Sequence, residues 1–252
     1  MGKLITGEKI VKTFGKGNEM AKVLDGVDIE ISKGEFVAVM GPSGSGKTTL
    51  LFTLSGTDTV TGGSVKFKDV NLSQLGENEL ADIRRASIGF VFQQPTMLKN
   101  LNILDNIILP AMYGDKKNKA GIIEKARSLM EKTGIAELEK RDITEVSGGQ
   151  LQRAGICRAI MNSPDILFAD EPTGALNTKS ADEIMALLVA VNKEGAAILL
   201  VTHDAKVASR ADRVLFMKDG AIVYDLSLTE TAESDFDLRT EKVIMQMQAV
   251  GI

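Results

Sequence analysis

The sequence predicts an α/β fold in which helices cover a mainly parallel sheet, with an N-terminal antiparallel β part and a helical subdomain. Three observations support this prediction. Short apolar runs recur along the chain, with room for a helix between them. The first third alternates β-branched residues with glycine-rich turns. The middle third changes to helical periodicity.

The first third contains the predicted antiparallel part and the first buried strands. Partial alternation with glycine punctuation predicts strands at residues 4–14, 23–32 and 63–67. Residues 36–40 and 88–92 are apolar runs, typical of strands that are buried on both faces. A glycine-rich turn follows the first of these runs, and the apolar segment after it predicts a helix that ends at Gly56.

The middle third, from about residue 95 to residue 163, is predicted to be helical. Residues 104–112 are strongly apolar, and residues 119–133 place an apolar stripe on one face of a helix that Gly134 would end. Between them, residues 113–119 form a short polar segment with three lysines. This composition predicts a solvated loop.

The last third returns to alternating strands and helices. Buried strands are predicted at residues 166–169 and 197–201, around a helix at 180–192. Residues 213–218 and 221–224 are typical of a hairpin that turns at Asp219 and Gly220, and residues 235–252 are a candidate final helix. The repeated strand–helix pattern predicts a parallel sheet that is covered on both faces.

Composition excludes several classes of protein. The chain has 252 residues, enough for one large domain or two small ones, and its hydrophobic share of 44% is ordinary for a globular protein. Its 30 Lys and Arg residues against 34 Asp and Glu residues give a net charge of −4, which argues against a nucleic-acid partner. One cysteine forms no internal disulfide and suits a reducing compartment. We see no apolar run of roughly 18 residues and no secretory signal.

A phosphate-binding pattern, GxxxxGK[ST], occupies residues 41–48, between a predicted buried strand and a predicted helix. Glycines let backbone N–H groups turn towards phosphate oxygens, and the helix adds the positive end of its dipole. We expect Lys47 to reach the β- and γ-phosphates and the Thr48 hydroxyl to bind Mg²⁺. The predicted nucleotide-binding residues of this segment are Gly41, Pro42, Ser43, Gly44, Ser45, Gly46, Lys47, Thr48 and Thr49.

Acidic residues and the only histidine follow two other predicted strands. Asp170 ends the strand at 166–169 and is expected beside the phosphate loop, near the Mg²⁺. Glu171 comes next and is the candidate general base for the attacking water. His203 follows the strand at 197–201, so we expect it at the same edge of the sheet.

A second glycine-rich helix start identifies the kind of phosphate-loop protein. Ser147, Gly148, Gly149 and Gln150 lie between Lys47 and Asp170 in the chain, at the start of a predicted helix, where they could contact a second anion. With these residues the sequence resembles the ATP-binding-cassette (ABC) ATPases, whose signature motif is this segment. The resemblance covers nearly the whole chain and implies a P-loop NTPase core.

The resemblance assigns further roles. Phe14 stands where the family places an adenine-stacking aromatic residue. Gln93 matches the glutamine that senses Mg²⁺ and the attacking water, and His203 matches the histidine that contacts the γ-phosphate. Asn177 replaces the usual Asp in the loop after Glu171, and Val146 replaces the usual Leu before the signature. The loss of charge at Asn177 is expected to affect the coupling between the two ATP sites of a dimer, and not ATP binding itself.

The resemblance also implies domains and an assembly. It predicts a nucleotide-binding domain at residues 1–225, with its core at 1–92 and 164–225 and its helical subdomain at 93–163, and a C-terminal extension at 226–252. ATP and Mg²⁺ are the implied cofactors. In this family two copies face each other, and each ATP lies between the phosphate loop of one and the signature of the other. We therefore expect a homodimer.

A separate membrane permease is the implied partner, which would hold the chain at the cytoplasmic face of the cell membrane as a peripheral subunit. The helical subdomain is the expected docking surface. Its candidate contacts are Phe92, Met97, Leu98 and Leu101. Each of them could instead fill the core of the subdomain.

Finer resemblance points to one branch of the family. Residues 170–176 and 102–110 resemble the branch that serves lipoprotein release, macrolide export, cell-division signalling and antimicrobial-peptide resistance. The tail after residue 235 is most similar to the bacitracin- and lantibiotic-resistance ATPases. These pair with a ten-span permease that has a large extracellular domain, often alongside a sensor kinase.

Several alternatives remain beside antimicrobial-peptide resistance. Lipoprotein or macrolide handling is one, and an ATP-driven mechanical or signalling module that moves no substrate is another. Soluble cassette ATPases of DNA repair or translation usually carry coiled-coil insertions or two cassettes, and neither is predicted here. A GTPase would need Asn-Lys-x-Asp, and residues 192–195 lack the Asp.

Overall fold

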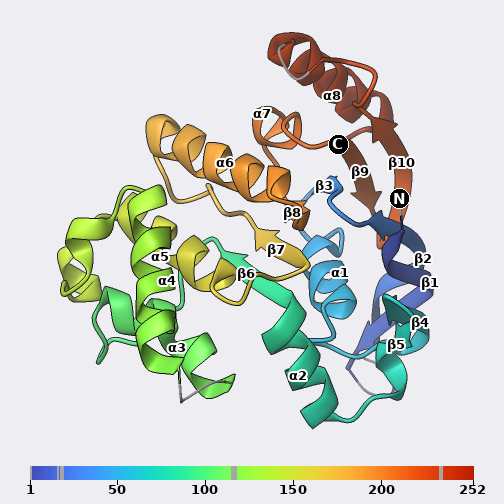
Figure 1. Cartoon of the computed structure of the whole chain (residues 1–252). Coiled ribbons are helices and arrows are strands. Elements are labelled where there is room, and N and C mark those ends of the chain that lie inside the picture. The colour runs from blue at the N-terminus through green and yellow to red at the C-terminus, as the bar shows by residue number, and fades with distance from the viewer. Residues whose placement is uncertain (1, 16, 18–19, 115–117, 233–234) are drawn as a thin grey trace.

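The fold is built on two sheets that share a layer of buried residues. The computed structural model describes residues 2–15, 17, 20–114, 118–232 and 235–252. One sheet is antiparallel, in the order β2-β1-β4-β5, and the other has the order β10-β9-β3-β8-β7-β6 (Figure 1). Part of the loop predicted at 113–119, residues 115–117, lies outside the described residues.

The six-stranded sheet is the parallel sheet that the sequence predicts. Its parallel strands are β3 (Phe36–Met40), β6 (Ile88–Phe92), β7 (Ile166–Asp170), β8 (Ala197–Val201) and β9 (Arg213–Lys218). Strand β10 (Ala221–Ser227) pairs antiparallel with β9 and closes one edge, running past the predicted end at residue 224. β3 and β8 are buried along their whole length, as expected for strands that are covered on both faces.

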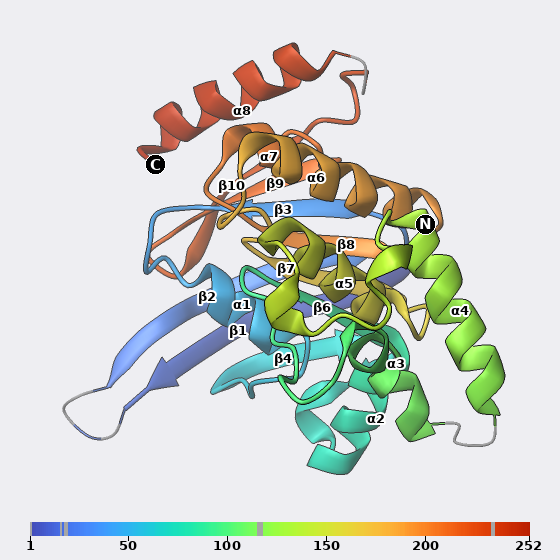
Figure 2. The ribbon, with the colours of Figure 1, turned by 90° about the vertical axis from the view of Figure 1, so that its left-hand side faces the viewer.

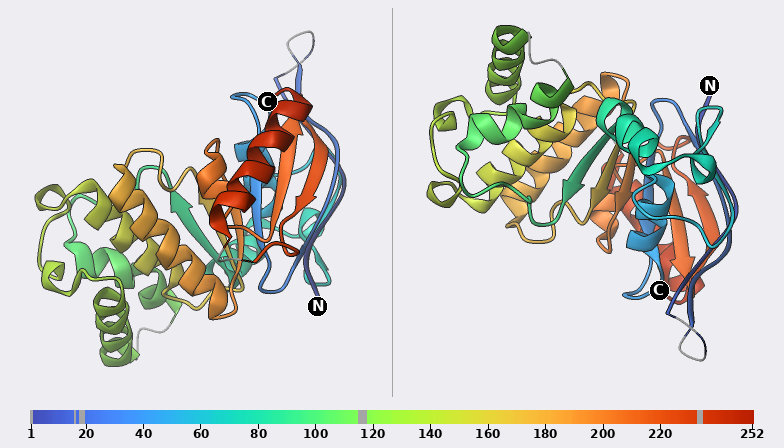
Figure 3. Two further views of the ribbon diagram at one scale, coloured as in Figure 1. Left: turned by 90° about the horizontal axis from the view of Figure 1, so that it is seen from above. Right: turned by 90° about the horizontal axis from the view of Figure 1, so that it is seen from below.

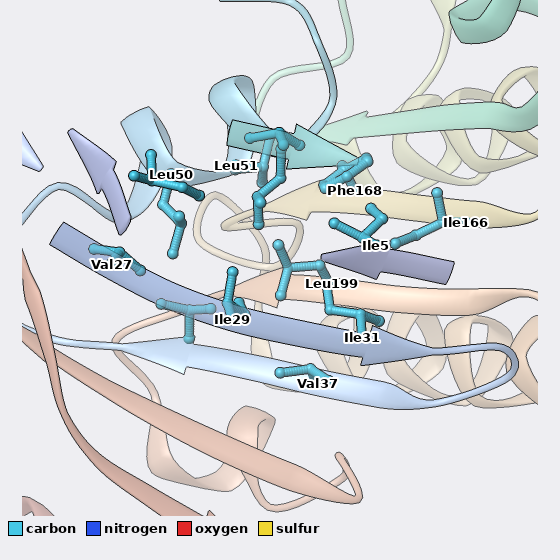
Figure 4. Packing of buried hydrophobic residues seen from close by; sticks show 14 of the residues in the cluster. Ile5, Val27, Ile29, Ile31, Val37, Leu50, Leu51, Ile166, Phe168 and Leu199 are labelled. Atoms are coloured by element: carbon cyan, nitrogen blue, oxygen red, sulfur yellow. The ribbon is translucent and has the colours of Figure 1, made fainter. Parts of the chain in front are cut away.

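The antiparallel sheet covers one face of the parallel sheet. It consists of β1 (Lys3–Phe14), β2 (Ala21–Ser32), β4 (Gly62–Phe67) and the short β5 (Val70–Asn71). Helix α1 (Lys47–Leu54) is packed between the two sheets, where its leucines join one apolar cluster with both (Figure 4). The position of α1 is therefore set by burial on two sides.

Three more helices cover the opposite face. These are α6 (Thr178–Lys193), the one-turn α7 (Ala205–Ala208) and the C-terminal α8 (Phe236–Val250), and Figure 2 shows them above the six-stranded sheet. Buried residues of all three join a second apolar cluster with β3, β8 and β9. The predicted final helix is thus confirmed, and it packs on the domain core through Val243.

The helical subdomain has a core of its own. It contains α3 (Ile103–Gly114), α4 (Lys119–Lys132) and α5 (Gly148–Ile160), whose apolar residues form a third cluster. Figure 3 shows these helices at the end of the molecule away from the β1–β2 hairpin. Two helices were not predicted: α2 (Glu77–Ser87), which is rich in charged residues and buries only Leu80, and the one-turn α7.

The single cysteine lies in the core of the helical subdomain. Cys157 is fully buried, its Sγ is 3.1 Å from the Thr133 Oγ1, and burial raises the pKa of its thiol to about 11. Because the thiolate is the reactive species, we expect no labelling of the native protein by a disulfide reagent at about pH 8. Full labelling should follow denaturation in guanidinium. Rapid labelling of native protein would contradict this packing.

Candidate nucleotide-binding and catalytic site

The parallel sheet brings the predicted site residues to one edge. The phosphate loop follows β3, Asp170 ends β7, and His203 lies shortly after β8. Gln93 directly follows β6. Because these four strands are parallel neighbours, their carboxyl ends meet at the same edge of the sheet, where ligands bind in open α/β sheets.

Two glycines, Gly41 and Gly46, allow the phosphate loop to lie close to the backbone of neighbouring strands. A Cβ atom at Gly41 would lie 2.2 Å from the Met217 carbonyl oxygen, so a larger residue there would displace the loop from β9. Gly46 has a φ of +98° and immediately precedes α1. The first backbone N–H groups of α1 therefore stand at the end of the loop, where they suit an anion.

Lys47 lies folded into the phosphate loop. Its Nζ donates to the carbonyl oxygens of Gly41 and Pro42, both at 2.8 Å. Burial lowers the pKa of this ammonium, while the charges of Glu171 and Asp170 act in the opposite direction. The Lys47 ammonium is partly desolvated and lies against the backbone of the phosphate loop, so it is suited to bind an anionic ligand such as a nucleotide phosphate.

Thr48 and Asp170 come together across 122 residues of sequence. The Thr48 Oγ1 is 3.1 Å from Oδ2 and 3.2 Å from Oδ1 of Asp170. Burial raises the pKa of Asp170, and Glu171 adds to this, while the Thr48 hydroxyl and Lys47 oppose it. A hydroxyl and a carboxylate at one point, beside a phosphate loop, fit the oxygen ligands that Mg²⁺ prefers.

Glu171 and His203 form the other close pair. The His203 Nδ1 is 2.8 Å from the Glu171 Oε1. Glu171 has a φ of +46°, which is uncommon for a residue with a side chain, and its backbone N–H donates to the Val201 carbonyl at 2.9 Å. A strained backbone conformation persists only where the surrounding structure holds it in place, and such residues are common at functional sites.

The residues expected around the nucleotide lie near this pair and at the β1–β2 hairpin. The exposed Gln93 approaches the loop after Glu171, since a Cβ at Gly174 would be 2.8 Å from its Nε2. Phe14 ends β1 with 45% of its surface exposed, and the Lys12 Nζ lies 5.0 Å from its ring centroid. An aromatic ring with this exposure is suited to stack on a base.

The signature residues are built for exposure at a helix start. Ser147 caps α5: its Oγ accepts from the Gln150 N–H at 3.3 Å, and the Gln150 Oε1 accepts from the Ser147 N–H at 2.9 Å. Ser147 and Gly148 are exposed, while Gly149 and Gln150 are half-buried. Among the described residues, none of these four forms a hydrogen bond or ion pair with the phosphate loop, so the structure does not bring the two motifs together within one chain.

Asn177, where the family usually has Asp, has a local role that sequence reasoning missed. Its Oδ1 accepts from the Ser180 N–H at 2.9 Å and caps α6. Asn and Asp are about equally good at this position, so the cap survives the exchange. The signal was available, because an Asn before an apolar periodic segment is a helix-start pattern.

A large groove separates the core from the helical subdomain. It has a volume of about 1060 Å³ and is mainly apolar, and Arg84, Arg85 and Arg158 lie among its lining residues. Phe92 is among its lining residues. Met97 instead fills the core of the helical subdomain, while Leu98 is exposed and Leu101 is half-buried.

Among the described residues, no helix combines the length and the apolar character needed to cross a bilayer.

Comparison with known proteins gives consistent matches. The family model described as "ABC transporter" matches residues 24–174, more than half of the chain. The bacitracin export ATP-binding protein BceA of Halalkalibacterium halodurans is 41% identical over 248 residues, covering 98% of this chain and 96% of that protein. The macrolide export ATP-binding/permease protein MacB of Pasteurella multocida is 40% identical over 227 residues. That match covers 90% of this chain but only 35% of MacB, so this chain spans about a third of the longer protein.

Solved structures agree with the sequence matches. A dimeric ATP-binding cassette, in a post-hydrolysis state bound to ADP and Pi, is similar with a TM-score of 0.84 and 35% identity. The similarity covers 89% of this chain and 99% of that one.

Proposed function

The chain belongs to the ABC transporter family as an ATP-hydrolysing subunit, and we propose that it drives a membrane permease that protects a bacterium from bacitracin-like antimicrobial peptides. The observation that carries this proposal is the nearly end-to-end similarity to BceA, at 41% identity. The MacB match is comparable in identity but covers a third of that protein.

The site supports a division of labour in ATP hydrolysis. Glu171 is the general base that accepts a proton from the attacking water, and His203 holds its carboxylate through the contact between Nδ1 and Oε1. Lys47 and the N-terminus of α1 bind the phosphates, and Phe14 stacks on the adenine. Gln93 approaches from β6, where it can sense the occupied site.

Thr48 and Asp170 would hold Mg²⁺, and Gln93, which follows the neighbouring strand β6, would be a further oxygen ligand. The ion, when bound, would offset negative charge on the phosphate oxygens. Burial raises the pKa of Asp170, and a bound cation, like Lys47, would favour its ionised form.

Two copies of this chain would complete each other's sites. The signature at the start of α5 is exposed, and in one chain it makes no hydrogen bond to the described phosphate loop. A helix N-terminus with free backbone N–H groups suits an anion supplied by a second copy. The similarity to a dimeric cassette supports this arrangement.

The groove between core and helical subdomain would take the permease. Its apolar lining, with arginines among it, suits a short amphipathic helix that carries acidic residues. In this proposal the chain is a peripheral subunit at the cytoplasmic face of the membrane. The resemblance to bacitracin-resistance ATPases adds a ten-span permease with a large extracellular domain, and a sensor kinase that acts through it.

Antibiotic sensitivity tests the proposal. Deletion of the gene from its host should lower the concentration of bacitracin that stops growth. The wild-type gene should restore resistance and the Glu171→Gln variant should not, with erythromycin sensitivity as the control. A change in erythromycin sensitivity alone would favour macrolide export, which the MacB similarity makes the second candidate. Restored resistance without ATP-dependent movement of peptide in reconstituted vesicles would favour a signalling module.

A further inference from the structure

Helix α7 begins two residues after His203 and is a single turn. Asp204 caps it: its Oδ1 accepts from the backbone N–H groups of Lys206 at 2.8 Å and Val207 at 3.4 Å. One turn of helix is not stable alone, because forming it fixes several residues for few hydrogen bonds. The position of α7, and with it the adjacent His203, is therefore decided by what packs against it.

Helix α8 contacts three consecutive residues at the end of α7. The Thr240 Oγ1 lies 3.0 Å from the Oγ of the fully buried Ser209. The Phe236 ring lies under the Arg210 guanidinium, 4.1 Å from centroid to carbon. The buried Arg239 donates to the Ala211 carbonyl. The first two turns of α8 thus hold both the side chains and the backbone of this segment.

The apolar contact continues below these polar ones. Val243 of α8 is fully buried and belongs to the same cluster as Val207, Ala208 and Ala211. Buried apolar packing and a cation over an aromatic ring each contribute more to the free energy of folding than an exposed ion pair does.

The other side of α7 is loosely held. Asp182 of α6 lies 3.5 Å from the Lys206 Nζ and 4.0 Å from Arg210, and these three side chains are half-exposed. Beside them is a cavity of about 250 Å³ that also reaches Glu171 and His203. Exposed ion pairs contribute little to stability, so these contacts hold α7 only weakly. The cavity also leaves α7 room to shift towards α6. Helix α8 is therefore the stronger constraint.

We propose that Phe236, Arg239 and Thr240 of α8 are positioning residues for ATP hydrolysis, which hold α7 where the His203 imidazole meets the Glu171 carboxylate. The inference rests on the proposed roles of His203 and Glu171. It gives the C-terminal helix a part in turnover, although no residue of α8 lines the site.

The expected signature is a loss of rate without a loss of substrate binding. Lys47 and Thr48 are the first residues of α1, and their described hydrogen bonds do not involve α7 or α8. A shift of α7 should therefore leave the KM for ATP unchanged. Misplacing a catalytic group by about 1 Å can cost up to about 100-fold, so we expect kcat to fall about 10-fold when one contact of α8 is lost.

A matched set of full-length variants tests this. Phe236→Leu removes the ring under Arg210 but keeps apolar bulk, and Phe236→Tyr keeps the ring. Met245→Ala, on the same helix at a position that is 69% exposed, is the control. We expect kcat to fall for Phe236→Leu and Thr240→Val, with rescue in Phe236→Tyr and no change in Met245→Ala.

The single histidine provides a direct spectroscopic readout. Because His203 is the only histidine in the chain, untagged protein with labelled histidine gives one imidazole signal in NMR. Phe236→Leu should shift or broaden that signal and Met245→Ala should not. A wild-type signal and a wild-type kcat in both Phe236→Leu and Thr240→Val would overturn the proposal, even if their melting temperatures fall.

One further variant separates this inference from the proposed function. If His203→Ala keeps wild-type turnover, the assigned role of His203 fails. If His203→Ala is inactive while Phe236→Leu is fully active, only the positioning role of α8 fails. An equal loss of kcat in Met245→Ala would also overturn it, because the effect would not follow the contacts with α7.

Discussion

The Glu171→Gln variant should bind ATP normally and hydrolyse it about 100- to 10,000-fold more slowly than the wild type, the usual worth of a general base. Gln has nearly the same shape and can still hydrogen-bond to the His203 Nδ1, which lies 2.8 Å from the carboxylate in the wild type. The amide cannot accept the proton of the attacking water. Steady-state phosphate release and equilibrium nucleotide binding together measure this difference.

The same variant should accumulate as an ATP-bound dimer, because hydrolysis is the step that separates the copies. Size-exclusion chromatography with light scattering, at saturating ATP, measures the shift in mass. Glu194→Gln is the matched control, since this carboxylate is exposed at the end of α6 and pairs only loosely with Lys132 at 3.3 Å. A Glu171→Gln protein that stays monomeric with ATP bound would contradict the shared site.

The second large effect concerns the signature. Ser147→Arg should lower turnover by about 100-fold or more, because a bulky side chain at the start of α5 blocks the anion contact that this helix offers to the partner's nucleotide. ATP binding to the isolated subunit should persist, since Ser147 makes no described hydrogen bond with the phosphate loop of its own chain. Ser147→Ala separates the loss of the helix cap, which costs about 1 kcal/mol of stability, from the steric block.

Mixing two inactive variants tests whether the site is shared. Ser147→Arg keeps an intact phosphate loop, and Lys47→Ala keeps an intact signature. A heterodimer of the two has one complete site, formed by the loop of the first subunit and the signature of the second. The mixture should therefore hydrolyse ATP when neither variant does so alone. Full activity of Ser147→Arg by itself would refute the arrangement.

Much of the catalytic edge could be predicted because its parts are local. An apolar run such as Phe36–Met40 identifies a buried strand, and the residue type at its carboxyl end identifies the chemistry. Parallel strands then bring their ends together without further information. The contacts between Thr48 and Asp170 and between Glu171 and His203 agree with that reasoning.

Two helices, α2 and α7, could not be predicted because few apolar residues mark them in the sequence. Helix α2 is rich in charged residues and buries one leucine, and α7 has only four residues, so neither has the run of apolar residues that marks a buried helix in a sequence. Met97 shows the limit for single residues, because an apolar side chain next to a groove and one inside a core are alike in sequence. Only packing decides between them.

The amino-acid sequence by itself predicted the chemistry of the site: a phosphate loop, a candidate metal-binding pair, a candidate general base and a helix start that suits an anion. The phosphate loop and the helix start depend on residues that are close in the chain, where backbone sterics and hydrogen bonding act directly. Thr48 and Asp170 are 122 residues apart, and the parallel order of their strands brings them together. The tertiary structure decided which distant surfaces meet. It placed α8 against the segment after His203, formed the groove beside Phe92, and left the signature with no described hydrogen bond to its own phosphate loop. Such contacts depend on how whole faces of helices and sheets bury one another, and no local pattern records this.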